Sequence, residues 1–198
     1  MSDRIWPRLG AASGAIYVVV LMVGPTLGDG AVVIAGELVA MMLFVAFAAY
    51  LTSVLQAAEG PGAWLAPTVL AAAVVDTSVK LGSAGAGYAA RDLSDGSLHT
   101  ALHDINNVSF VVSMAPLALL TAAVSVIVLR TRVLPRVFGW SGVVIAAALA
   151  ASAGALGSET IYAFLLFLAW TLALSVTLTV RGAASVPTAA SSVTVTAR

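Results

Sequence analysis

Residues 31–55 decide the fold class: they read AVVIAGELVAMMLFVAFAAYLTSVL, and Glu37 is the only charged residue among them. A transmembrane helix needs about 20 mostly apolar residues to cross about 30 Å of hydrocarbon. The whole chain of 198 residues has a similar character, because it is 61% hydrophobic and only 9% charged. A soluble domain is about 45–50% apolar and about 25% charged. The sequence therefore predicts an all-α, polytopic membrane protein.

Six segments are long and apolar enough to span a membrane, and turn-forming residues separate them. The predicted spans are residues 9–27, 31–55, 63–90, 98–129, 137–156 and 160–180. We expect a single six-helix transmembrane bundle over residues 1–181, followed by a flexible cytoplasmic tail over residues 182–198. Pro116 removes a helix hydrogen bond to the carbonyl of Val112, so a kink is expected in the fourth span.

The arginines predict the orientation, because basic residues concentrate in cytoplasmic loops. With six spans, one side of the membrane carries Arg4, Arg8, Arg130, Arg132, Arg136, Arg181 and Arg198. Only Arg91 falls on the other side, and Lys80 lies within a span. We therefore expect a multi-pass protein of the cytoplasmic (inner) membrane with both termini in the cytoplasm.

Composition and motifs exclude several classes of protein. The nine basic and nine acidic residues cancel, which argues against a nucleic-acid partner. The chain has no cysteine, so disulfides and thiolate chemistry are excluded. It also has no Gly-x-Gly-x-x-Gly, Walker or Gly-x-Ser-x-Gly motif, and we expect no cofactor.

A few ionisable side chains lie inside the predicted spans, where each costs roughly 2.5–3.5 kcal/mol at the helix centre and is a functional candidate by default. They are Glu37, Asp76, Lys80, His99, His103 and Asp104. Asp76 and Lys80 lie one turn apart on one face of their helix. The helical rise per residue places the whole set in or above the outer half of three consecutive spans. We predict an outward-facing polar pocket with Asp76 at its base.

Each candidate has an expected role in this pocket. Glu37 has no partner on its own helix and is the expected proton donor, because an acid held in an apolar site can donate a proton. Asp76 is the expected base or charge stabiliser, and Lys80 is the partner that tunes it. The expected substrate-binding residues are His103, Asp104, Asn107, Tyr17 and Phe110.

Structural alternatives remain open for the same residues. In one, Asp76 and Lys80 only neutralise each other. In another, His99 and His103 are ordinary solvated histidines. In a third, these two histidines chelate a metal ion that Glu37 or Asp104 helps to hold, whereas our prediction is a site without metal.

Residues 130–140 read RTRVLPRVFGW, and the chain has eight arginines for one lysine. The chain resembles small uncharacterised multi-pass membrane proteins of high-GC bacteria in these features and in its Ala-, Val- and Gly-rich composition. That likeness implies no activity and no site residues. The chain is also similar in size to membrane-embedded terpene cyclases, which use buried carboxylic acids as proton donors. This second resemblance implies that Glu37 and Asp76 are the acids.

Three functions remain as hypotheses. The first is binding of an apolar small molecule, or acid–base catalysis on it by cyclisation or isomerisation. The second is a proton-coupled small-solute carrier acting as a homo-oligomer, which needs a polar path to the cytoplasm. The third is a structural or regulatory membrane subunit, in which the polar residues pair and leave no cavity. The expected partners are the lipid bilayer and an apolar small molecule.

Overall fold

The computed structural model describes residues 5–26, 30–91, 96–154 and 160–181, and every element in these ranges is a helix. The elements are α1 (Ile5–Val23), the short 3-10 helix η2 (Gly24–Thr26), α2 (Ala31–Glu59), α3 (Leu65–Arg91), α4 (Gly96–Val112), α5 (Met114–Thr131), α6 (Arg136–Ala153) and α7 (Thr160–Arg181). Six of the segments are long and apolar enough to cross a membrane when α4 and α5 count as one. The all-helical class and the six apolar segments are confirmed. The predicted tail lies outside the described residues, as do Arg4 and Arg198.

The fourth apolar segment is broken where Pro116 predicts a kink. α4 ends at Val112 and α5 begins at Met114, with Ser113 in a turn between them. Pro116 has no N–H to donate to the Val112 carbonyl, and the Leu117 N–H reaches the Ser113 carbonyl only at 3.4 Å. The helical hydrogen bonding is therefore interrupted at this point, as Pro116 predicts, while Ser113 keeps helical backbone angles and its N–H donates to the Ser109 carbonyl at 3.0 Å.

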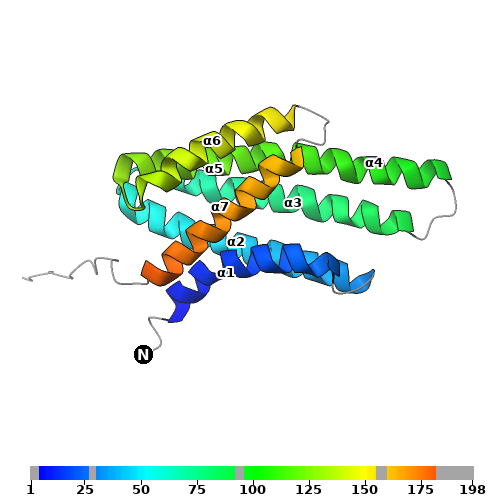
Figure 1. The fold of residues 1–198 in the computed structure, drawn as a ribbon, viewed down its shortest axis with the longest axis horizontal. Helices are drawn as coiled ribbons and strands as arrows, with labels where there is room; N and C mark the ends of the chain where they lie inside the picture. Colours follow the sequence, from blue (N-terminus) through cyan, green and yellow to red (C-terminus); the bar gives the residue numbers. More distant parts are fainter. Residues whose placement is uncertain (1–4, 27–29, 92–95, 155–159, 182–198) are drawn as a thin grey trace, which may run out of the picture.

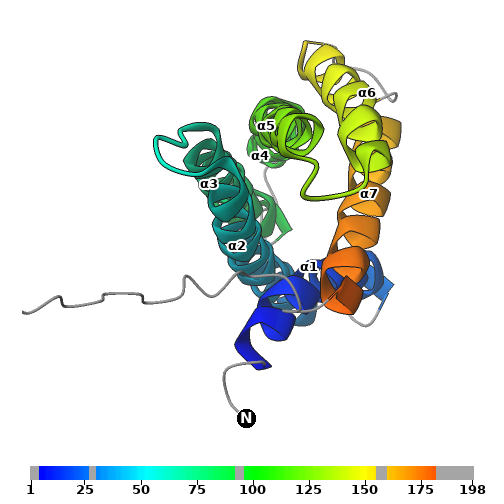
Figure 2. The ribbon, with the colours of Figure 1, turned by 90° about the vertical axis from the view of Figure 1, so that its left-hand side faces the viewer.

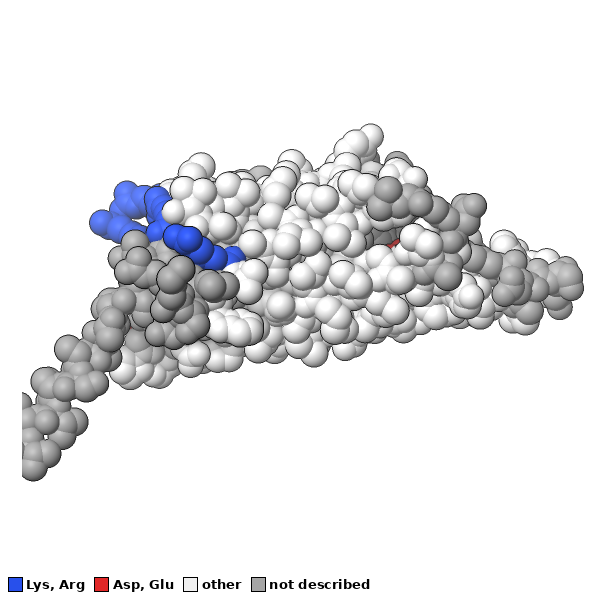
Figure 3. Space-filling view, turned by 90° about the horizontal axis from the view of Figure 1, so that it is seen from below, with Lys and Arg blue, Asp and Glu red and all other residues white. Residues whose placement is uncertain are grey.

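Successive apolar segments run antiparallel along the long axis of the molecule (Figure 1). Seen from one end, α5 lies between the side formed by α2 and α3 and the side formed by α6 and α7, while α1 lies beside α7 (Figure 2). This order brings five arginines of the described chain to one end: Arg8, Arg130, Arg132, Arg136 and Arg181. Figure 3 shows basic side chains gathered at that end, which we call the arginine end.

The interior toward the arginine end is a packed apolar core. Its largest fully buried side chains include Phe44, Leu51, Leu55, Val69, Val124, Ile127 and Leu174. One hydroxyl group joins the first helix to the last: the Ser175 Oγ donates to the Ala11 carbonyl and accepts the Ala15 N–H at 2.8 Å. Because the hydroxyl satisfies both partners within the apolar interior, it fixes the crossing of α1 and α7 at this end.

Glycines let α1 approach α2 closely. A Cβ atom on Gly14 would lie 2.7 Å from the Phe47 ring, and one on Gly10 would lie 2.9 Å from Tyr50. Phe47 is buried, with 3% of its surface exposed, so its ring has little room to move away. The close contact between α1 and α2 therefore requires glycine, which has no side chain, at positions 10 and 14.

We expect Gly14→Ala to destabilise the protein. Overpacking a core costs about 1–3 kcal/mol, which outweighs the gain of about 0.8–1.0 kcal/mol that alanine has over glycine in a helix. Thermal unfolding in detergent, followed by tryptophan fluorescence, should show a lower midpoint. Gly85→Ala is the matched control, because a Cβ there meets nothing within 4 Å. An equal loss of stability in both variants would contradict the close packing of α1 on α2.

Candidate functional site: a cavity with acidic and basic side chains

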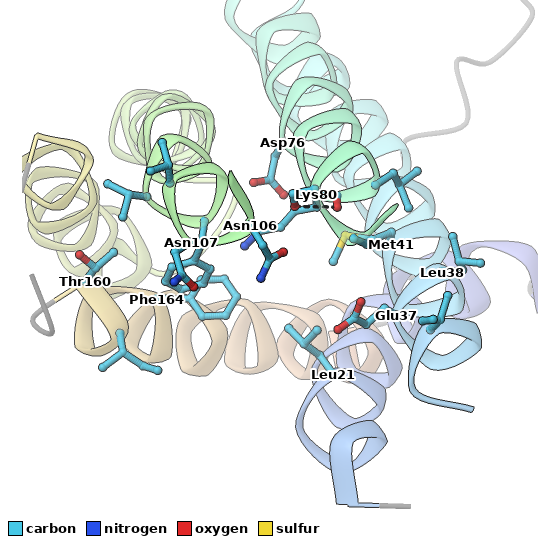
Figure 4. A pocket seen from close by; sticks show the side chains of 18 of the residues that line it. Leu21, Glu37, Leu38, Met41, Asp76, Lys80, Asn106, Asn107, Thr160 and Phe164 are labelled. Carbon is cyan, nitrogen blue, oxygen red and sulfur yellow. Dashed lines mark hydrogen bonds between the residues drawn. The ribbon is translucent and has the colours of Figure 1, made fainter. Parts of the chain in front are cut away.

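A cavity of about 800 Å³ lies among α1, α2, α3, α4 and α7, in the half of the bundle away from the arginine end (Figure 4). Cavities that bind small molecules usually have about 300–1,000 Å³, so this one is large enough for a ligand. A second cavity of about 320 Å³ lies beside it, between α2, α3 and α4. The two share part of their lining: Ile34, Glu37, Ala84 and Asn106.

α3 places Asp76 and Lys80 on the wall of the main cavity, since residues four apart share a helix face. Asp76 is 2% exposed, and its Oδ1 atom accepts no hydrogen bond from any residue that the structure describes. Lys80 interacts electrostatically with Asp76 and with Glu37, but no salt bridge within the described chain joins it to Asp76. Asp76 therefore lines the cavity and has a buried acceptor atom, Oδ1, without a hydrogen bond from the described chain.

The charge of Lys80 is held by aromatic rings from two other helices. Its Nζ atom lies 4.0 Å from the centroid of Phe110 on α4 and 5.5 Å from that of Phe164 on α7. The two rings contact each other edge to face, with 5.3 Å between centroids. Because the face of an aromatic ring attracts a cation, these rings direct the lysine into the cavity.

Glu37 faces the cavities from α2, and Tyr17 faces the main cavity from α1. The Glu37 side chain is half-buried and belongs to the lining of both cavities. Tyr17 is buried, contacts Phe44 with its ring tilted by 34° and 4.9 Å between ring centroids, and interacts electrostatically with Asp76. Figure 4 shows the side chains of Glu37, Asp76 and Lys80 around the same space.

The remaining predicted binding residues divide between the cavities. Asn107 and Phe110 line the main cavity, whereas His103 lines the second one. The Nδ2 atom of Asn107 and the Nδ1 atom of His103 lie 3.0 Å apart, so one hydrogen bond links the two linings. Asp104 is exposed and belongs to neither lining. It lies about one helical turn beyond Asn107, past the main cavity, so the expected role of Asp104 in substrate binding stays a prediction.

The metal-binding alternative finds no support in the described part of the chain. His99 and His103 stack with 6.4 Å between ring centroids. No group of three or more His, Cys, Asp or Glu residues there could hold a metal ion, so neither Glu37 nor Asp104 completes a ligand set with the two histidines.

α7 contributes cavity residues that the sequence gives no reason to select. Thr160, Ile161 and Phe164 line the main cavity from this helix. An aromatic or aliphatic residue in an apolar span looks the same whether it faces lipid, core or cavity. Asn106 is different, because it shares a helix face with His99 and His103, and the structure places it in both linings.

Comparison with protein families, curated proteins and solved structures finds no match to this chain. Both resemblances noted from the sequence therefore stay predictions, and function has to be inferred from the cavity and its side chains.

We expect Lys80 and Phe110 to be energetically coupled. A double-mutant cycle with Lys80→Met and Phe110→Leu should give a coupling free energy of about 0.5–2 kcal/mol, the range for a cation over an aromatic ring. The measurement is the free energy of unfolding in detergent for the four proteins. Strictly additive effects would contradict the contact.

Proposed function

We propose that the chain is a multi-pass membrane protein that binds an apolar small molecule in the main cavity and acts on it by acid–base catalysis. The observation behind this proposal is the convergence of Glu37, Asp76 and Lys80 on one mostly apolar cavity of about 800 Å³. Apolar pockets with a few convergent polar groups are typical binding or active sites, and ionisable groups within spans are functional candidates.

Two carboxyl groups on different helices suit a proton-transfer reaction such as isomerisation or cyclisation. In our scheme Glu37 donates a proton to one carbon of a double bond, and the electron pair of that bond forms the new C–H bond. Asp76 then removes a proton from another carbon, and the released pair forms the new double bond. The ligand gains and loses one proton, so no oxidant or reductant is required. Lys80, held on the Phe110 ring, balances the charge of Asp76.

We also propose that the arginine end lies in the cytoplasm and that the cavity lies toward the outer side of the cytoplasmic (inner) membrane. The gathering of arginines at one end supports this orientation through the positive-inside rule. Trp6, Trp64 and Trp140 lie near the same end and are 74%, 70% and 64% exposed. Exposed tryptophans at the end of a bundle are typical of the boundary between membrane and water.

The two other hypotheses agree less well with the geometry. A purely structural subunit needs polar residues that pair and leave no cavity, whereas the Oδ1 atom of Asp76 lacks a partner in the described chain. A carrier needs a polar path toward the arginine end. The interior there contains fully buried apolar side chains such as Phe44, Phe167 and Leu117, so the acid–base proposal is favoured.

Mass spectrometry of small molecules extracted from the purified protein tests this proposal. We expect the wild type in mild detergent to retain an apolar metabolite, and Glu37→Gln and Asp76→Asn to retain less of it or an unreacted precursor. Asp104→Asn is the matched control, because it removes an acid that lines neither cavity. Only bulk lipid in all four preparations would overturn the proposed function.

A further inference from the structure

The main cavity has a side wall made by two helices that separate from each other. α1 and α7 are joined toward the arginine end, where Ser175 bonds to Ala11 and Ala15. Toward the opposite end α7 runs obliquely away from α1 (Figure 1). The cavity is lined there by residues near the end of α1 and the beginning of α7, including Leu21 and Ile161.

Described residues near this gap are apolar and exposed. Val19 and Met22 on α1 are 54% and 46% exposed, and Ile161 on α7 is 51% exposed. Among the described residues, the face in Figure 3 shows few charged side chains away from the arginine end, and a small acidic area is visible there. Because α1 and α7 are both long and apolar enough to cross a membrane, an opening between their ends would face the lipid bilayer near its surface when the protein is inserted.

We propose that the cavity takes its ligand sideways from the bilayer, between Leu21 on α1 and Ile161 on α7, and that this ligand is a lipid-soluble alcohol. The inference rests on the proposed function and deepens it, because it names the substrate class and its entrance. A molecule dissolved in the membrane reaches this entrance without crossing water, and its apolar body suits the mostly apolar lining.

The polar groups of the cavity favour a hydroxyl group on the ligand. The Oδ1 atom of Asp76 is buried without a hydrogen bond from the described chain, and an unsatisfied buried acceptor costs about 1–3 kcal/mol. Asn106 and Asn107 also line the cavity, and their amide groups can donate. A hydroxyl group is both donor and acceptor, so it can donate to Asp76 and accept from an asparagine at once.

Photolabelling of the protein in lipid nanodiscs tests the ligand class. The probe is hexadecanol that carries a diazirine within its chain, and labelled residues are mapped by peptide mass spectrometry. We expect labels on α2 and α3 at the cavity, and loss of these labels when unlabelled hexadecanol, but not hexadecane, is in excess. Equal competition by both compounds would overturn the hydroxyl assignment. Absence of label in the cavity would overturn the alcohol class, yet it would leave the proposed function standing if the extraction experiment recovers a bound metabolite.

The entrance is tested with a reversible cross-link, for which the cysteine-free chain is well suited. Leu21→Cys and Ile161→Cys are combined and joined by thiol-reactive cross-linkers of increasing length, each coupled through reducible disulfides. We expect cavity labelling to be lost on cross-linking and to return on reduction. The two single-cysteine variants, treated in the same way, should keep it.

A second variant tests the same entrance without a cross-link. Ile161→Trp should narrow the opening and reduce cavity labelling, whereas Tyr162→Trp should not, because Tyr162 is 67% exposed and lines neither cavity. Unchanged labelling in both the cross-linked protein and Ile161→Trp would overturn the entrance between α1 and α7. That result would leave the acid–base function untouched.

Discussion

The contact of the Lys80 ammonium group with the rings of Phe110 and Phe164 is the interaction on which the cavity half of the bundle depends. A lysine in an apolar span must find compensation for the water that it loses. α3 supplies the cation, whereas α4 and α7 supply the aromatic faces, so one interaction draws three helices around a common space. Lys80 also interacts electrostatically with Asp76, whose Oδ1 atom accepts no hydrogen bond from the described chain.

The hydrogen bonding of the fourth apolar segment is interrupted at Ser113, between α4 and α5. Without the hydrogen bond that Pro116 cannot make, α4 and α5 are separate helices within one apolar segment. α5 belongs to the packed core and contributes many buried residues, whereas no residue of α4 is buried. The fourth segment therefore serves two purposes: its α5 half stabilises the bundle, and its α4 half lines the cavities with Asn106, Asn107 and Phe110.

The two halves of the molecule differ in packing. Toward the arginine end, Gly10 and Gly14 allow close helix contacts, and Ser175 bridges α1 and α7. In the other half the same helices diverge around a cavity of about 800 Å³. Polar and charged groups are best positioned on rigid elements. The packed half can hold α2, α3 and α7 in place, while the open half presents Glu37, Asp76 and Lys80 to a ligand.

The sequence by itself determined the positions of groups along the long axis of the bundle. Apolar length set the six segments, Pro116 marked the break, and the rise per residue put Glu37, Asp76 and Lys80 in the same half. Only the tertiary structure decided which groups meet around that axis. Phe164 enters the site from α7, while Asp104 lies outside it. The helical period shows which residues share a face of one helix. It does not show how each helix is rotated against its neighbours, because that rotation depends on packing. In the sequence, apolar residues that face lipid cannot be told from apolar residues that face a cavity.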